Sequence, residues 1–392
     1  MDKDKQLVKK YIDESNLDEN SDLLTVITRL ITMPIQYSDI LIHEDSPIYI
    51  RMSRGWVEVP LGEIFRGKME EFFFGMDNKW QDKLLPREDE HGNMQPSGKL
   101  NLSRDMDRAR VRCNGFVHGD GKLGMAIRRI PKDIPKLAEI GIPLGVADAL
   151  NRNRGLILIT GPVGNGKSTT MAAMLGYINN LRCGHILTLE DPLEFVHTNT
   201  KSIFTQREIP KHAKTFRDGF KEALRERPDV IAIGELRDKD TIETCLEGAD
   251  AGLLMIATMH ANNASSAINK FLGFYSDFEH KQKAAQLAES LIVVVSQTLV
   301  PSSVEGRNGS ELAYEVLVNN SQVRQQIAAQ QTDKIKDLLS LDPTPGSRLK
   351  SNTLNSCLAD LVNQGKVNKV DAINYSYDPA DLEKELNKPK RN

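Results

Sequence analysis

The sequence lacks several features that would each point to a particular class of protein. Its four cysteines stand apart, with no C-x-x-C pair, which argues against a disulfide framework and a four-cysteine zinc site. The longest apolar runs, 156–159 and 291–295, are far shorter than the ~20 residues that span a bilayer. The charged N-terminus has no apolar stretch typical of a secretory signal. A formal net charge of −3 argues against a protein that coats nucleic acid.

Length and composition are instead those of a soluble cytoplasmic protein with two or three domains: 392 residues, 40% hydrophobic and 27% charged. Alternating apolar residues between 40 and 59 predict short strands of a small mixed domain. Further along, apolar runs alternate with helical patterns. These runs are 155–160, 185–190, 229–234 and 253–258. Strands that are buried on both faces and separated by helices predict a parallel α/β sheet.

Breaks in the pattern divide the chain. Proline and glycine gather at 130–145 and again at 341–348, and a polar stretch interrupts the first domain. The expected organisation is a mobile or marginally helical arm (1–22), an N-terminal domain (23–130) with a long polar loop or insertion (75–105), a linker (131–145), an α/β domain (146–340) and a helical tail (341–392).

The strongest motif is GPVGNGKS at 161–168, directly after the apolar strand 155–160 and before the helical run TTMAAMLGYI. The spacing G-x4-G-K-[ST] lets backbone N–H groups curl around an anion at the start of a helix. A glycine-rich turn with an incidental lysine is the alternative, which the strand and helix on either side disfavour. We therefore predict that this chain binds a nucleoside triphosphate with Mg²⁺. The predicted binding residues are Gly161, Pro162, Val163, Gly164, Asn165, Gly166, Lys167, Ser168 and Thr169.

Three further clusters end apolar strands of the same domain. LTLEDPLEF (187–195) carries Glu190, DVIAIGELRD carries Glu235, and LLMIATMHANN carries His260. The ends of parallel strands are where nucleotides and metals bind in open α/β sheets. A carboxylate there can hold Mg²⁺ or orient the attacking water. The alternatives are a charged turn at Glu190, a surface acid paired with Arg237 at Glu235, and a polar residue without a catalytic role at His260.

In this order, the four clusters resemble the secretion ATPase superfamily that drives type II secretion, type IV pili and type IV secretion. GPVGNGKSTT is similar to its Walker A motif, LTLEDPLEFVH to its Asp box, ALRERPDVIAIGELRD to its Walker B segment and TMHANN to its His box. The resemblance extends over residues ~23 to ~330. It is nearest to the PilT-like branch, which contains pilus retraction motors and the DotB/TraJ-type ATPases of type IVB secretion and conjugation.

The resemblance implies a homohexameric ATPase in which each subunit has a PAS-like N-terminal domain and a RecA-like ATPase domain, with ATP and Mg²⁺ as its cofactors. It also implies a role for each site residue. Lys167 and Ser168 bind phosphate and metal, and Glu235 is the catalytic carboxylate and a metal ligand. Glu190 supports metal or water, and His260 contacts the γ-phosphate. Arg112 and Arg128 complete a neighbouring subunit's site.

Two departures from the family bear on the load that the motor drives. The sequence has no tetracysteine element, and SQVRQQIAAQ (321–330) keeps only Arg324 of the A-I-R-N-L-I-R-E motif of retraction motors. We therefore expect a type IVB-like secretion or conjugation motor, recruited to the inner membrane by protein partners. A pilus retraction ATPase is the alternative. A RecA-like protein that translocates nucleic acid is the rival of another class, but aromatic residues are only 6% and no basic-aromatic run is present.

Overall fold

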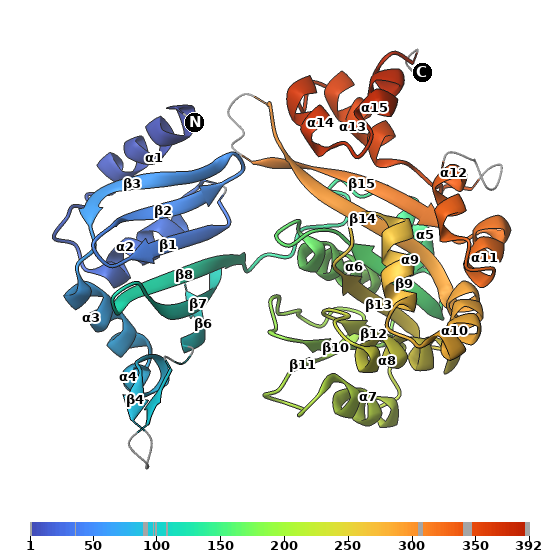
Figure 1. Ribbon diagram of the computed structural model, residues 1–392, viewed down its shortest axis with the longest axis horizontal. Coiled ribbons are helices and arrows are strands. Elements are labelled where there is room, and N and C mark those ends of the chain that lie inside the picture. Colours follow the sequence, from blue (N-terminus) through green and yellow to red (C-terminus); the bar gives the residue numbers. More distant parts are fainter. Residues whose placement is uncertain are drawn as a thin grey trace. The chain divides into compact units, whose positions relative to one another are not determined.

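A computed structural model describes residues 2–35, 37–88, 93–96, 98, 100–106, 109–304, 309–339 and 347–388. The described residues form two compact units (Figure 1). Unit 1 contains the described residues up to Lys132 together with residue 309. Unit 2 contains the described residues from Asp133 onward, apart from residue 309. No helix of this described part is both long enough and apolar enough to cross a bilayer.

Unit 1 is built on a six-stranded sheet in the order β3-β2-β1-β8-β7-β6. All of its strand pairs are antiparallel. Buried and more exposed side chains alternate along the strands, so one face carries the core, as the alternating apolar residues predict. The likeness to a PAS domain remains a prediction. The strands are β1 (Asp39–His43), β2 (Pro47–Met52), β3 (Gly55–Glu63), β6 (Leu100–Met106), β7 (Ala109–His118) and β8 (Lys122–Pro131).

The N-terminal segment, expected as a mobile or marginally helical arm, contains the helix α1 (Asp2–Glu14). Val8 and Ile12 of this helix are buried in the core of unit 1, and Leu7 and Tyr11 pack against the same core. The next helix is α2 (Leu23–Thr32), which begins where the carboxylate of Asp22 accepts a hydrogen bond from the backbone of Thr25.

For the segment 75–105, expected as a long polar loop or insertion, the loop is wrong because most of its described residues form helices and strands, and the insertion remains a prediction. After α3 (Arg66–Met76), the chain forms the short helix α4 (Trp80–Leu84), whose Trp80 and Leu84 are buried. It continues with the two-stranded β4 (Arg87–Glu88) and β5 (Met94–Gln95), and then with β6, which pairs with β7. Residues 89–92, 97 and 99 of this segment lie outside the described residues.

Unit 2 is built on a seven-stranded sheet in the order β11-β10-β12-β13-β9-β14-β15. The first six strands are parallel and only β15 is antiparallel, and β9, β12 and β13 are buried along their whole length. The four expected strands are therefore present as a parallel α/β sheet. The strands are β9 (Gly155–Thr160), β10 (His185–Glu190), β11 (Ile203–Glu208), β12 (Val230–Ile233), β13 (Leu254–Met259), β14 (Leu291–Pro301) and β15 (Ser310–Val318).

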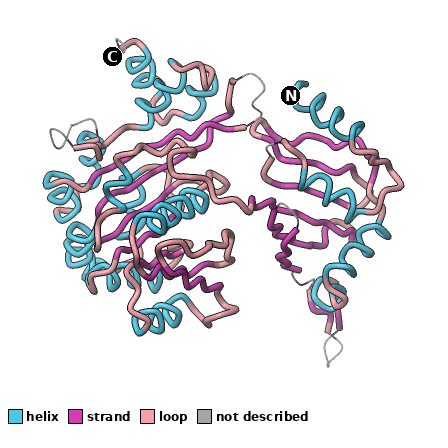
Figure 2. Tube along the Cα trace, turned by 180° about the vertical axis from the view of Figure 1, so that it is seen from behind, coloured by secondary structure: helices cyan, strands magenta, loops and turns pink. Residues whose placement is uncertain are grey.

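Helices cover both faces of this sheet, as Figures 1 and 2 show from opposite sides. One face packs against α5 and α6, and the other against α7 to α12. Both faces need such a cover because successive residues of each buried strand point to opposite sides of the sheet, so that both faces are apolar. The helices are α5 (Val146–Leu150), α6 (Lys167–Leu181), α7 (Phe216–Arg225), α8 (Lys239–Asp250), α9 (Ala264–Leu272), α10 (Asp277–Ser290), α11 (Ser321–Ala328), the 3-10 helix η1 (Thr332–Lys334) and α12 (Ile335–Leu338).

Two segments at the borders of unit 2 pack onto it. Leu137 and Ile142, within the expected linker, are buried in the core on the α6 side, so this part of the chain is not a free connection. The described part of the tail forms α13 (Leu354–Asn363), α14 (Lys369–Tyr375) and α15 (Pro379–Leu386). Between the last two helices, the hydroxyl of Tyr377 donates a hydrogen bond to the backbone carbonyl of Asn262, which lies in the loop between β13 and α9.

Candidate active site

The candidate site begins where β9 ends. The loop 161–166 connects β9 to α6, and three of its residues are glycines with positive φ. Gly161 has φ +151°, and a Cβ on it would collide with the backbone carbonyl of Gln297 in β14. Gly166 has φ +75° and leads directly into the helix. Glycine is needed at these positions because side chains rarely tolerate this backbone conformation.

The loop is also fixed from outside by β14. The side-chain oxygen of Asn165 accepts hydrogen bonds from the backbone N–H of Leu299 at 2.7 Å and from the hydroxyl of Thr298 at 3.2 Å. The backbone carbonyl of Asn165 accepts a third one from the side chain of Gln297 at 2.6 Å. The loop therefore keeps its curved shape ahead of the N-terminus of α6, where free N–H groups and the helix dipole favour an anion.

Lys167 is the first residue of α6, and only 8% of its surface is exposed. Its ammonium group donates to the carbonyls of Gly161 and Pro162, both at 2.8 Å, and lies 3.0 Å from Nδ1 of His260. Burial lowers the pKa of Lys167 to about 8, although the negative charge of Glu235 acts in the opposite direction. The charge is therefore placed at the mouth of the loop, at a cost in solvation that a bound phosphate would offset.

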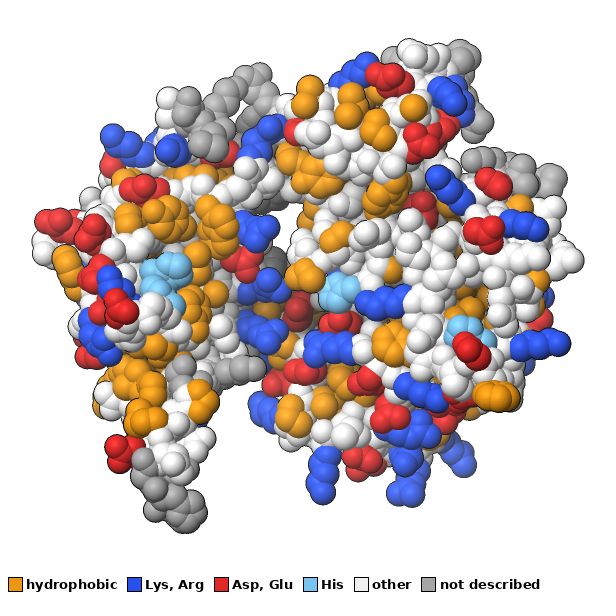
Figure 3. All heavy atoms as spheres, in the orientation of Figure 1, with side chains coloured by type: hydrophobic (Ala, Val, Ile, Leu, Met, Phe, Trp, Pro, Cys, Tyr) orange, Lys and Arg blue, Asp and Glu red, His pale blue; other side chains and the backbone are white. Residues whose placement is uncertain are grey.

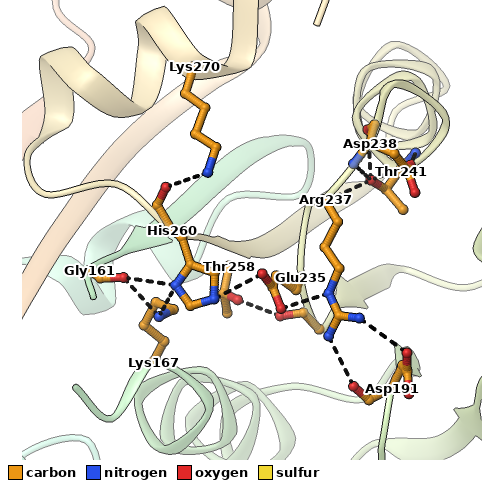
Figure 4. Close-up of polar contacts among 11 residues, drawn as sticks. Gly161, Lys167, Asp191, Glu235, Arg237, Asp238, Thr241, Thr258, His260 and Lys270 are labelled. Atoms are coloured by element: carbon orange, nitrogen blue, oxygen red, sulfur yellow. Dashed lines mark hydrogen bonds and ion pairs between the residues drawn. The ribbon is translucent and has the colours of Figure 1, made fainter. Parts of the chain in front are cut away.

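The parallel order of the sheet explains why residues distant in sequence meet here. Glu235 follows the end of β12, and His260 follows the end of β13, which lies between β12 and β9. Figure 4 shows the resulting chain of contacts: Nδ1 of His260 faces Lys167, and Nε2 lies 3.0 Å from Oε1 of Glu235. Of the residues predicted from the sequence, Lys167, Glu235 and His260 are thus brought together.

Arg237, which the sequence offers only as an alternative partner of Glu235, also belongs to this group of residues. Its Nε lies 2.8 Å from Oε2 of Glu235, and its Nη1 lies 3.3 Å from a carboxylate oxygen of Asp191, at the end of β10. Glu235 therefore contacts both His260 and Arg237, so the expected ion pair with Arg237 is present, and the catalytic role of this carboxylate remains a prediction. The short spacing of Glu235 and Arg237 in GELRD indicates that the two side chains can pair. Only the fold shows that Arg237 also contacts Asp191.

Glu190, the last residue of β10, lies beside this chain of contacts. Only 7% of its surface is exposed, and burial raises its pKa to about 7. The described side-chain contacts do not connect it to Lys167, His260 or Glu235. A buried carboxyl with a pKa near neutrality can exchange a proton during a reaction, which agrees with a supporting role. That role remains a prediction.

Ser168 and Glu235 are the predicted ligands of Mg²⁺. Ser168 lies in the first turn of α6, next to Lys167, and offers a hydroxyl oxygen. Glu235 offers carboxylate oxygens, and both donor types are those that Mg²⁺ prefers. The residues therefore fit a magnesium ion that is bound together with nucleotide phosphates. Among the described residues, no group of three or more His, Cys, Asp and Glu side chains could hold a metal ion by itself.

Arg112 and Arg128 belong to unit 1. They are cross-strand neighbours of β7 and β8, and the strand register places them directly opposite each other. Arg128 forms an ion pair with Asp39 of β1, with 3.0 Å between Nε and the carboxylate oxygen. The two arginines thus form a paired basic position on one sheet. Their role toward nucleotide remains a prediction.

Comparisons of this chain with a family model, a characterised relative and a solved structure all point to secretion and pilus ATPases. Residues 143–367 match the family model described as "Type II/IV secretion system protein". The chain is 38% identical over 264 residues to the type IV pilus retraction ATPase PilT of Pseudomonas aeruginosa, covering 67% of this chain and 74% of that protein. A crystal structure of the pilus retraction motor PilT with bound ADP has a TM-score of 0.75 and 31% identity, covering 93% of this chain and 100% of that chain.

The ATPase DotB of Legionella pneumophila is similar in fold. Its structure has a TM-score of 0.71 and covers 88% of this chain and 92% of that chain, but only 21% of the aligned residues are identical. This likeness supports the mixed α/β architecture and carries no evidence for a shared activity. The matches therefore favour the pilus-retraction alternative over the expected type IVB role.

Proposed function

The chain belongs to the type II/IV secretion system protein family, and we propose that it is the motor ATPase that powers retraction of a type IV pilus. It is an ATP hydrolase, and it is similar to retraction ATPases over two thirds of its length. The observation that supports hydrolysis is the contact chain from Lys167 through His260 to Glu235, at the carboxyl ends of parallel strands, and the 38% identity to a retraction ATPase supports retraction as the load. The contact chain places a phosphate-binding cation, a polar relay and a carboxylate side by side.

Each residue then has a task in phosphoryl transfer. The curved loop and the start of α6 hold the phosphates, and Lys167 turns from its loop carbonyls toward the β- and γ-phosphates. Glu235 orients the attacking water, and His260 senses the γ-phosphate because it lies between Lys167 and Glu235. Ser168 would hold Mg²⁺ directly and Glu235 would hold it through water, and the ion would neutralise charge on the phosphate oxygens. Positioning and charge stabilisation supply nearly all of this chemistry, so small displacements of these groups are costly.

Assembly is the second part of the proposal. We infer a homohexameric ring that acts at the inner membrane and is recruited there by protein partners. Arg112 and Arg128 of one subunit would supply positive charge to the γ-phosphate of its neighbour. The described part of the chain has no membrane-spanning helix, and the face of unit 2 drawn in Figure 3 mixes acidic and basic side chains. Such a face does not offer the continuous basic path that single-stranded nucleic acid requires.

One observation favours a second candidate, the motor of a type IVB-like secretion or conjugation system. The segment 321–330, most of which forms α11, keeps only Arg324 of the motif found in retraction motors. Arg324 lies 3.9 Å from a carboxylate oxygen of Glu289 in α10. The chemistry of the two candidates is the same and only the load differs.

The proposal is tested by expressing the chain in a Pseudomonas aeruginosa strain that lacks PilT and measuring twitching motility. We expect motility to return with the wild-type chain and not with Lys167→Ala, which removes the phosphate-binding cation. ATP hydrolysis is measured on the purified proteins in parallel. A chain that hydrolyses ATP, reaches the same level in the cell and restores no motility would contradict retraction and favour the second candidate. Full hydrolysis by Lys167→Ala would contradict the site itself.

A further inference from the structure

Both oxygens of the Glu235 carboxylate have a basic partner. Oε1 lies 3.0 Å from Nε2 of His260, and Oε2 lies 2.8 Å from Nε of Arg237. The first partner also contacts Lys167 and therefore belongs to the phosphate-binding group. The second partner lies on the opposite side of the carboxylate and contacts a different strand end (Figure 4). The two oxygens of Glu235 thus face different surroundings.

The backbone of Arg237 is held at a fixed place. Its N–H donates to the hydroxyl of Thr241 at 3.2 Å, and the backbone N–H of Thr241 donates to the carboxylate of Asp238 at 2.8 Å. The hydroxyl of Thr241 also accepts a hydrogen bond from the backbone N–H of Asp238 at 3.3 Å, which completes the capping box that starts α8, and Thr241 is buried. A capping box fixes the entry of the chain into a helix. The guanidinium group of Arg237 therefore extends from an anchored position, two residues after Glu235.

Asp191 fixes the other end of the Arg237 side chain. Nη1 lies 3.3 Å from the Asp191 carboxylate, and Nη2 lies 3.4 Å from the Asp191 backbone carbonyl. Three acceptors thus determine the plane of the guanidinium group, which a lysine ammonium does not have. The Arg237 side chain is 49% exposed, and ion pairs at such sites contribute little to stability. These contacts therefore fix the orientation of the Arg237 guanidinium group and add little to the stability of the fold.

We propose that Arg237 is a positioning residue that holds Oε2 of Glu235, so that Oε1 alone turns to the attacking water. This inference rests on the proposed function, because it takes Glu235 as the group that orients water. When Lys167 and His260 engage the phosphates, Oε1 loses its partner while Oε2 keeps Arg237. A carboxylate that is fixed through one oxygen presents the other in a defined direction.

The test compares Arg237→Ala and Arg237→Lys with a matched control, Arg217→Ala. Arg217 is also a partly exposed arginine of unit 2 with one acidic partner, Glu247 at 3.1 Å, but that pair lies between α7 and α8. We expect both Arg237 variants to lower kcat by roughly 10- to 100-fold, with the Kd for a fluorescent ATP analogue within about threefold of wild type. Added guanidinium should restore part of the activity of Arg237→Ala, and the control should keep the wild-type kcat.

Asp191→Asn completes a double-mutant cycle. If Asp191 acts through Arg237, the variant with Asp191→Asn and Arg237→Ala should be no slower than Arg237→Ala alone. A kcat for Arg237→Lys within about twofold of wild type would overturn the inference. A Kd for the ATP analogue that rises by as large a factor as kcat falls would also overturn it. Glu235→Gln separates the two claims. If Glu235→Gln hydrolyses ATP normally, the proposed site fails, whereas an inactive Glu235→Gln with a normal Arg237→Ala refutes only the positioning role.

Discussion

Lys167 can be identified as a phosphate-binding residue from the sequence, but the burial and the hydrogen bonds of its ammonium group cannot. The motif predicts a cation at the start of α6, but not that its ammonium group is buried and donates to two carbonyls of its own loop. Likewise, the sequence places Glu235 and His260 at strand ends, and the parallel order brings them together. The bridge from Arg237 to Asp191 depends on side-chain directions, and no spacing in the sequence encodes those.

The lowered pKa of Lys167 predicts proton uptake on nucleotide binding. With a pKa of about 8, Lys167 is mostly neutral at pH 9, and a neighbouring triphosphate restores its proton. Calorimetric titration of ATP in buffers of different ionisation enthalpy should therefore show close to one proton taken up at pH 9 and little below pH 7. Lys167→Arg is the control, since a guanidinium group does not titrate in this range. Equal uptake at both pH values would contradict the prediction.

Glu190 predicts a pH dependence of stability with the opposite sign to that of most carboxylates. Its pKa of about 7 in the folded protein lies above the ordinary 4.5, so the folded state holds the proton more tightly. The contribution of Glu190 to the free energy of unfolding is therefore fully present below pH 4.5 and is lost as the pH rises through 7. Glu190→Gln should remove this decline and raise the stability at pH 8, by at most about 3 kcal/mol.

Urea unfolding of the two proteins at pH 5, 6, 7 and 8 measures this difference. The exposed Glu247→Gln variant, which loses the pair with Arg217, serves as the matched control and should leave the slope of stability against pH unchanged. If Glu190→Gln and the wild type keep the same slope, Glu190 does not bear the raised pKa.

At the scale of elements, long runs of apolar residues were the reliable signal. The strands β9, β10, β12 and β13 lie within a residue of their expected bounds because each is buried on both faces. Short elements with few apolar residues are harder to predict. α4 buries Trp80 and Leu84, and this pattern is too short to distinguish a helix from a polar loop, whereas the expected marginally helical arm contains α1.

Trp80 is the anchor whose removal tests the order of the segment that was expected to be a loop. It is 2% exposed, and its ring lies 5.3 Å from that of Phe73. Trp80→Ala should lower the free energy of unfolding of unit 1 by about 3 to 5 kcal/mol, because it leaves a large cavity. The other tryptophan, Trp56, is 42% exposed, and Trp56→Ala should cost under about 1 kcal/mol. Similar losses in denaturant unfolding for the two variants would contradict a packed α4.

At the scale of the whole molecule, the proposed ring, together with the proposed action of Arg128 on a neighbour, predicts cooperation between subunits. Arg128→Ala and Lys167→Ala should each abolish hydrolysis in uniform rings, since an arginine supplied in trans can be worth ~10³ in turnover. Mixing the two variants places an intact loop next to an intact Arg128, so activity should partly return. The measurement is the steady-state ATPase rate across mixing ratios, with mixed hexamers confirmed by mass. No recovery in confirmed mixed rings would show that Arg128 does not act on a neighbour.

The hydrogen bond from Tyr377 to the carbonyl of Asn262 has a practical consequence for anyone who labels this protein. Asn262 is two residues from His260, and Tyr377 immediately precedes the cap of α15, the last helix of the described chain. A fluorophore, affinity tag or surface tether attached beyond α15 is therefore joined through one short helix to a residue that contacts the loop between β13 and α9, which carries His260. Turnover should be compared between tagged and untagged preparations before an immobilised sample is taken as native.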